Sequence, residues 1–152
     1  MLNKSKPLVS IIINCHNGEN FLEDCLRSVI NQTYENWEII FWDNQSTDKS
    51  KEIIKNFSDK RIKYYYAKKF TTLYEARNLA LNVATGSYIS FLDTDDWWSP
   101  SKIEKQIKVF EKNKNLDVVY SNCFFFYNKT GKKKVFSKNL PEGKITQKLL
   151  NH

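Results

Sequence analysis

Apolar and polar positions form alternating blocks along the chain. Continuous runs of β-branched and aromatic residues, typical of strands buried on both faces, lie at 9–13, 37–42, 61–66, 87–92 and 117–127. Between these runs, apolar residues recur at helical spacing and predict helices over 21–32, 73–84 and 99–110, with a short helix ending at Phe57. A return strand is predicted to start at Val135, after a turn over 128–132.

Strand and helix segments follow one another in βαβα order, which predicts a mostly parallel sheet with helices on both faces. The fold class is therefore α/β, with a Rossmann-like sheet. The 152 residues are enough for one domain with a sizeable core, and no linker or internal repeat divides them.

The acidic run Asp93-Thr94-Asp95-Asp96 comes directly after the strand over 87–92. Carboxylates this close repel one another unless a cation lies between them. Oxygen ligands suit Mg²⁺ or Mn²⁺, which proteins commonly bind together with substrate phosphates. A cluster that caps the next helix explains the run equally well, so the run alone leaves both readings open.

Polar loops follow three of the predicted strands, and in a parallel sheet these loops meet at one edge, where ligands bind. They contribute Asn14, His16 and Asn17, then Asp43 and Asn44, and then Asp93, Asp95 and Asp96. This convergence favours a binding site over separate capping groups.

The net charge of +7 suggests an anionic partner, but the basic residues are spread over helix faces. One cluster, Lys132–Lys134, is expected at a hairpin tip, and a solvated surface explains the charge better than nucleic-acid binding. Cys15, Cys25 and Cys123 lack the spacing of a disulfide framework or a zinc site, which indicates a reducing compartment. No apolar run approaches the roughly 18 residues of a spanning helix. We therefore expect a cytoplasmic protein.

Five segments in register resemble the nucleotide-sugar-binding half of a family 2 inverting glycosyltransferase with the GT-A fold. They are VSIIINCHNG (9–18), SVINQTY (28–34), WEIIFWDNQSTD (37–48), ARN (76–78) and GSYISFLDTDD (86–96). The resemblance extends from about residue 7 to residue 150. It implies transfer of a sugar from a nucleotide-diphospho-sugar, with UDP as the expected nucleotide, to a glycan or lipid-linked acceptor in cell-surface polysaccharide synthesis.

The resemblance also implies which residues line the nucleoside. His16 stands where the family commonly has a tyrosine that stacks on the base, and Asn17 belongs to the same loop. Asp43-Asn44 stands where the family usually reads Asp-Asp, whose second member accepts a hydrogen bond from the uracil N3–H. The Asn44 amide oxygen can still accept, but it lacks the charge. Asn14 replaces a frequent proline.

By the same resemblance, Asp93 and Asp95 match the DxD motif and would bind a divalent Mn²⁺ or Mg²⁺, with Thr94 between them at the nucleotide-sugar. Arg77 would face the diphosphate or order the acidic loop, although an ordinary helix-surface ion pair explains it almost as well. Asp96 fits a capping role or a water on the metal. The metal would act as a Lewis acid towards the departing nucleoside diphosphate. Trp97 and Trp98 would wall the sugar or pack internally.

No catalytic base is evident. Inversion requires a carboxylate that deprotonates the acceptor hydroxyl, and in this family it lies well beyond the DxD motif. After Asp117 the chain offers only Glu142, which resembles a connecting segment. We therefore expect residues 1–152 to form a single GT-A domain, truncated before the acceptor segment. Such a chain would bind donor and metal and transfer sugar weakly or not at all.

Two other functions remain open. A nucleotidyltransferase would also use acidic metal ligands, but its Gly-rich basic phosphate loop is poorly matched by residues 14–18. A non-catalytic nucleotide-binding or partner module derived from a glycosyltransferase is harder to separate. The sequence predicts no nucleic-acid partner, allows a peripheral position at the inner membrane face, and leaves the oligomeric state open.

Overall fold

The computed structural model describes residues 6–137 and 139–143 and divides into two compact units, Met1–Lys108 and Val109–His152. The first unit contains the four-stranded sheet, three helices and the start of a fourth. In chain order the elements are β1 (Val9–Cys15), α1 (Leu22–Ile30), β2 (Trp37–Asp43), α2 (Ser50–Lys55), β3 (Ile62–Tyr66), α3 (Leu73–Leu81), β4 (Tyr88–Phe91) and α4 (Lys102–Lys112). Helix α4 continues from the first unit into the second. The first four predicted strands and all four predicted helices are confirmed.

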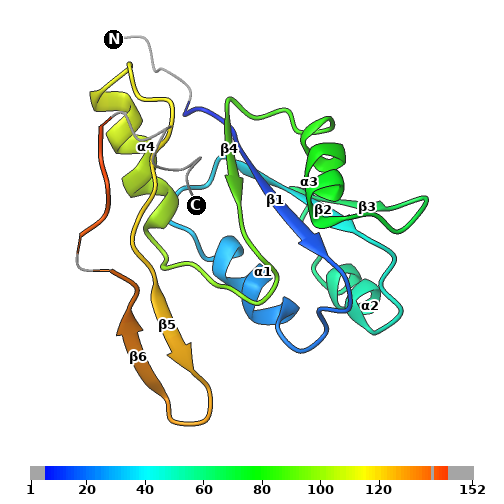
Figure 1. Cartoon of the computed structure of the whole chain (residues 1–152). Helices are drawn as coiled ribbons and strands as arrows, with labels where there is room; N and C mark the ends of the chain where they lie inside the picture. Colours follow the sequence, from blue (N-terminus) through cyan, green and yellow to red (C-terminus); the bar gives the residue numbers. More distant parts are fainter. Residues whose placement is uncertain (1–5, 138, 144–152) are drawn as a thin grey trace. The chain divides into compact units, whose positions relative to one another are not determined.

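The four strands form one parallel sheet in the order β3-β2-β1-β4 (Figure 1). In the register of the central strands, Ile11 lies opposite Ile39 on one side and Ser90 on the other. Because all four strands run the same way, the loops that follow them gather at one edge. The predicted α/β class and parallel sheet are therefore confirmed.

Helices cover both faces of the sheet, which explains why β1 and β2 are apolar on both sides. Leu22 and Leu26 of α1, Ile54 of α2 and Ile103 of α4 pack against the face that includes Ile11. Helix α3 covers the other face, where Ala80 meets Ile12 and Ile40 (Figure 1). Asn14 shares the α3 face with Ile12, because alternate residues of a strand point to the same side.

A buried polar network lies at the amino-terminal ends of the strands, opposite the predicted site. The Glu38 carboxylate accepts hydrogen bonds from Ser10 Oγ at 2.6 Å and from the Thr85 backbone N–H at 2.8 Å. Lys63 Nζ lies 2.6 Å from its other oxygen. Burial alone would raise the pKa of Glu38, but the Lys63, Ser10 and Thr85 contacts together lower it to about 2.

The second unit contains an antiparallel hairpin of β5 (Phe124–Tyr127) and β6 (Lys132–Val135). The predicted fifth strand is wrong over 117–123, which adopts no strand conformation. The expected hairpin tip is also wrong, since Lys132–Lys134 lie within β6. Gly131, at φ +65°, closes the turn earlier by donating its N–H to the Tyr127 carbonyl. The predicted return strand exists but starts at Lys132 rather than Val135.

Among the described residues, no helix has the length and apolar character needed to cross a membrane. None of the cysteines is in a disulfide.

Candidate functional site

The loops that follow β1 and β2 are joined by a row of hydrogen bonds. Asn17 adopts a positive φ of 56° and accepts a bond from the Thr47 backbone N–H at 2.8 Å through its side-chain oxygen. Its own backbone N–H donates to Ser46 Oγ at 3.0 Å. One residue further, the Gly18 N–H donates to Ser50 Oγ at 2.9 Å. Asn17 therefore lies at the predicted edge and holds the two loops together.

Asp43 ends β2 and is completely buried. One carboxylate oxygen accepts a hydrogen bond from the Ser46 N–H at 2.7 Å, and the other accepts one from the Tyr64 hydroxyl at 2.7 Å. Burial, followed by this bond to Asp43, raises the pKa of Tyr64 well above its usual value. Asp43 therefore ties Ser46, in the loop after β2, to Tyr64 of β3.

The Asn44 side chain forms three hydrogen bonds with Thr71, in the loop between β3 and α3. Its amide nitrogen donates to the Thr71 carbonyl at 2.8 Å. Its amide oxygen accepts from the Thr71 N–H at 3.2 Å and from the Thr71 hydroxyl at 3.1 Å. This Asn44–Thr71 bracket fixes the β3–α3 loop against the end of β2. Whether Asn44 also contacts a base stays a prediction.

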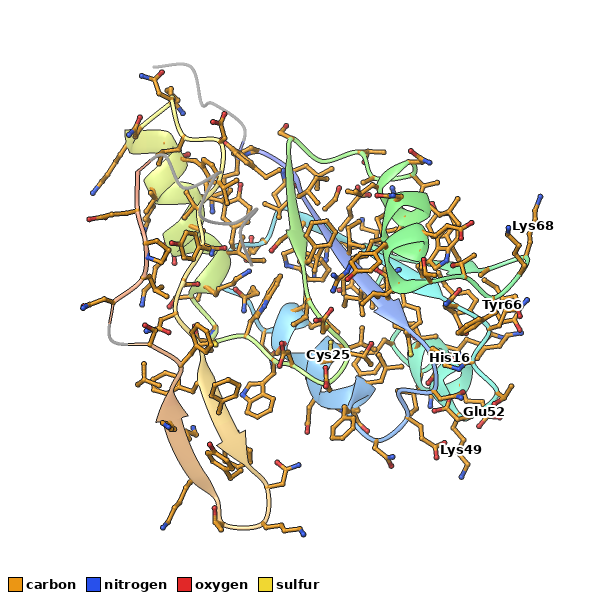
Figure 2. The ribbon with its side chains drawn as sticks, viewed as in Figure 1. His16, Cys25, Lys49, Glu52, Tyr66 and Lys68 are labelled. Carbon is orange, nitrogen blue, oxygen red and sulfur yellow. The ribbon has the colours of Figure 1, made fainter. Side chains whose placement is uncertain are left out.

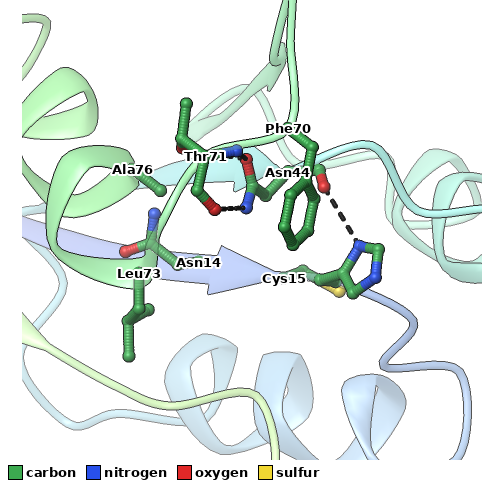
Figure 3. Close-up of a pocket in the computed structure, with 8 residues that line it drawn as sticks. Asn14, Cys15, Asn44, Phe70, Thr71, Leu73 and Ala76 are labelled. Atoms are coloured by element: carbon green, nitrogen blue, oxygen red, sulfur yellow. Dashed lines mark hydrogen bonds between the residues drawn. The ribbon is translucent and has the colours of Figure 1, made fainter.

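A pocket of about 160 Å³ opens between the end of β1 and the β3–α3 loop (Figure 3). Its lining residues are Asn14, Cys15, His16, Asn44, Phe70, Thr71, Leu73 and Ala76. His16 lies just beyond the end of β1, on the exposed rim (Figure 2). Its Nδ1 is 3.0 Å from the Asn44 carbonyl oxygen, and its ring meets the Phe70 ring edge-on at 4.8 Å.

Asn14, the penultimate residue of β1, lines this pocket. Its amide nitrogen is buried and has no hydrogen-bond partner within the part of the chain that the structure describes. In Figure 3 the amide lies between Leu73 and Ala76, at the start of α3. An unpaired donor in such surroundings is costly, which makes Asn14 the least satisfied polar group of the site.

The acidic run packs directly against the β1 loop. Thr94 donates its hydroxyl hydrogen to the Asn14 carbonyl at 2.8 Å. Its methyl group occupies the space that a Cβ at Gly18 would need, 2.5 Å away. The structure therefore brings Asp93, Thr94 and Asp95 to the same edge as the pocket, as the sequence predicts.

Arg77 of α3 forms an ion pair with Asp93, with Nη2 2.5 Å from Oδ1. The Asp96 N–H donates to the Asp93 carbonyl at 3.0 Å and closes a turn. Burial, and then the nearby Asp95 and Asp93 carboxylates, raise the pKa of Asp96. The mutual repulsion of these carboxylates is the condition that a bound cation relieves.

The donor atoms of the acidic run decide whether a divalent metal ion fits there. Within residues 6–137 and 139–143, no group of three or more His, Cys, Asp or Glu side chains is arranged around a metal position. Mg²⁺ and Mn²⁺ bound with nucleotides commonly use only one or two carboxylates, because phosphates and water complete the coordination. The hard oxygens of Asp93 and Asp95 fit that requirement.

Sequence reasoning missed the contribution of the β3–α3 loop. Phe70 and Thr71 line the pocket although neither was predicted, because the predicted site contained only the loops after the first, second and fourth strands. The rule that loops gather at the carboxyl edge would have included this one.

Lys102 was also missed by sequence reasoning. Its ammonium group donates to Ser90 Oγ at 3.0 Å and lies 3.4 Å from the centre of the Trp98 ring. Burial lowers the pKa of Lys102 to about 8.

The sequence matches the family model described as "Glycosyl transferase family 2" over residues 10–152. It is 41% identical over 115 residues to the Escherichia coli protein named UDP-Glc:alpha-D-GlcNAc-diphosphoundecaprenol beta-1,3-glucosyltransferase WfgD. That match covers 76% of this chain and 45% of WfgD. The chain thus spans less than half the length of this curated relative.

Two solved structures share the fold. The structure of S. aureus TarS 1-349 in complex with UDP superposes with a TM-score of 0.67 at 23% identity, covering 70% of this chain and 32% of that one. The mannosyltransferase PcManGT from Pyrobaculum calidifontis, in complex with GDP-Man and Mn²⁺, gives a TM-score of 0.65 at 22% identity, covering 70% and 33%. At these identities the likeness establishes the GT-A type of α/β fold.

Proposed function

The chain belongs to glycosyltransferase family 2, and from this premise we propose that it forms the donor-binding part of a glycosyltransferase that uses a nucleotide-diphospho-sugar. The proposed nucleotide is UDP, because the full name of WfgD gives UDP-Glc as its donor. In this proposal, residues 1–152 form one GT-A domain with this role. The observation that carries the proposal is the meeting of a ring-sized pocket and an acidic loop at one edge of the sheet.

The proposed nucleoside site consists of the loops after β1, β2 and β3. His16 and Phe70 offer aromatic surface for a base, while Asn17, Asp43 and Asn44 hold the surrounding loops in place. Rigid support of this kind keeps a binding site preorganised, so that less conformational entropy is lost when the ligand binds.

The proposed diphosphate site is the acidic loop. Asp93 and Asp95 would hold Mn²⁺ or Mg²⁺, which when bound supplies Lewis-acid stabilisation of the charge on the departing nucleoside diphosphate. Arg77 orients Asp93 through their ion pair, and Thr94 ties the loop to β1. Trp98, held by Lys102, is proposed to wall the sugar, together with the exposed Trp97.

The proposed acceptor is a glycan or a lipid-linked sugar of cell-surface polysaccharide synthesis, by analogy with the diphosphoundecaprenol named for WfgD. With a lipid-linked acceptor, the protein would act at the cytoplasmic face of the inner membrane and associate with that membrane peripherally.

The test is calorimetric titration of the chain with UDP, with and without Mn²⁺. We expect Mn²⁺ to strengthen UDP binding, and Asp95→Ala to abolish that gain because it removes a metal ligand. Asp117→Ala, at an exposed aspartate in the second unit, is the matched control and should behave like the unmodified chain.

If UDP binds equally well with and without Mn²⁺, the metal assignment is wrong. If no nucleotide binds at all, the donor-binding proposal fails and a partner module without nucleotide binding is favoured.

A further inference from the structure

The β5–β6 hairpin exposes aromatic and basic side chains together (Figure 1). We propose that this hairpin is a docking surface for an anionic lipid bilayer, with its aromatic rings in the headgroup region and its lysines beside negatively charged headgroups. The choice of a membrane as partner rests on the proposed function, because a lipid-linked acceptor lies in a bilayer.

Aromatic side chains lie on both faces of the hairpin. In an antiparallel strand pair, residues directly opposite each other share a face, and the faces alternate along each strand. One face therefore carries Phe124, Phe126, Lys133 and Val135, and the other carries Phe125, Tyr127, Lys132 and Lys134. All of these side chains are exposed.

Contacts within the hairpin do not hide these rings. The Phe125 ring meets the Phe136 ring edge-on at 5.7 Å, and the Lys133 ammonium lies 5.9 Å from the centre of the Phe126 ring. Phe124 is still 65% exposed and Phe136 59%. An antiparallel strand pair that packs one face on a core keeps its apolar residues on that face. With aromatic residues on both faces, the hairpin suits surroundings that reach it from both sides.

The hairpin is also strongly basic. Between Asp117 and Glu142 the sequence has five lysines and no acidic residue. The lysines at 129 and 132–134 are exposed. A lysine side chain can lay its methylene stem along apolar surface while its ammonium group stays in polar surroundings. Near an anionic bilayer, each such lysine adds to the attraction.

Charge and aromatic placement together favour a bilayer over other partners. An apolar protein surface, including that of a second copy of this chain, would desolvate the lysines without supplying negative charge. A nucleic-acid strand follows one groove of aromatic rings and basic groups, whereas here they lie on both faces. The interface of a bilayer surrounds an inserted hairpin and offers anionic headgroups to the lysines.

The backbone limits insertion to the headgroup region. In the described part of the chain, β5 and β6 form a sheet of two strands, so each strand has one outer edge that no further strand pairs. Hydrocarbon offers no hydrogen-bond partners for the backbone groups of such an edge, whereas water and lipid headgroups do. The turn over 128–131 is polar as well.

The test is binding of the 152-residue chain to sedimenting vesicles of phosphatidylcholine, with or without an equal part of phosphatidylglycerol. We expect at least about tenfold tighter binding to the anionic vesicles, and loss of that gain at high salt. Lys132→Gln, Lys133→Gln and Lys134→Gln together should weaken binding to anionic vesicles at least about tenfold. The corresponding triple arginine variant keeps the charge and should bind like the unmodified chain. Phe124→Ser with Phe125→Ser, one residue from each face, should weaken binding without a change in charge.

A matched variant controls for net charge. Lys51→Gln, Lys55→Gln and Lys60→Gln together remove the same charge from exposed positions of the first unit and should leave vesicle binding within about twofold. Circular dichroism checks that each variant is folded, and the serine variant decides if the glutamine variant is not. The measurement needs no nucleotide, so its result does not depend on whether UDP binds.

The inference is overturned if the chain binds both kinds of vesicle equally well or binds neither, or if the glutamine and serine variants bind as well as the unmodified chain. Binding to a single-stranded oligonucleotide but not to vesicles would assign the hairpin to nucleic acid instead. Self-association without vesicle binding would assign it to a second copy of the chain. All of these results leave the donor-binding proposal standing, whereas vesicle binding without UDP binding removes only the donor-binding proposal.

Discussion

Gly18 determines how closely the acidic run approaches β1. A Cβ at this position would lie 2.5 Å from the Thr94 methyl carbon and 2.9 Å from the Cys15 sulfur. Both neighbours are buried or half-buried, and the Thr94 hydroxyl is tied to the Asn14 carbonyl. A glycine is needed here for close contact between two loops and not for an unusual backbone angle.

We therefore expect Gly18→Ala to lower the free energy of unfolding by about 1–3 kcal/mol through overpacking. Adding Thr94→Ser should recover part of the loss, because serine removes the clashing methyl but keeps the hydroxyl. Urea denaturation of the two single variants and the double variant forms a double-mutant cycle. Additive losses in the double variant would show that the Thr94 methyl is not the limiting contact.

At the scale of single residues, the sequence located the site better than it described its chemistry. The positions of Asn14, Asn17 and Asp93 at one edge could be predicted, because parallel strands deliver their loops together. The Asn44–Thr71 bracket could not, since no short-range pattern links residues 27 positions apart. Asn14 stood out in sequence only as a replaced proline, and burial of its amide became visible in three dimensions.

The sheet depends on Glu38 as well as on its apolar residues. This carboxylate links β1 through Ser10, β3 through Lys63 and the β4 approach through Thr85. Its pKa is lowered from the ordinary value of 4.5 to about 2. Since the folded-state pKa lies below that of the unfolded chain, the ionised network stabilises the fold above pH 4.5. The stabilisation is lost as the pH falls towards 2.

We expect Glu38→Gln to cost about 2–3 kcal/mol at pH 7 and to flatten the dependence of stability on pH between 4.5 and 2. Glu52→Gln, at an exposed position of α2, is the matched control and should change neither quantity. Urea midpoints measured from pH 7 down to pH 2.5 provide the comparison. A parallel acid response in Glu38→Gln and the unmodified chain would contradict the assigned role of Glu38.

At the scale of elements, prediction succeeded where strands are buried on both faces. The apolar runs that form β1 and β2 lie between helices on both faces of the sheet. Their continuous hydrophobicity therefore indicates correctly that they are buried on both faces. The segment 117–127 is also rich in β-branched and aromatic residues, but only 124–127 form a strand, with β6 as partner. A strand requires a neighbour for its backbone hydrogen bonds, and sequence alone does not say whether the neighbour is present.

Over the whole molecule, burial is concentrated in one of the two units. In β1, six of the seven residues are buried. By contrast, none of the described residues from 109 to 137 or from 139 to 143 is buried. The β5–β6 hairpin carries exposed aromatic side chains, and an isolated two-stranded hairpin is only marginally stable in water.

Hydrogen exchange should follow this division. We expect the backbone amides of β1 and β2 to exchange only through global unfolding, and those of β5 and β6 to exchange at least about a thousandfold faster. Mass spectrometry of peptides from the two units, at two protein concentrations, measures the difference. Protection of β5 and β6 as strong as that of β1 would contradict the expectation. If that protection weakened on dilution, a second copy of the chain would be the group that covers the exposed aromatic side chains of the hairpin.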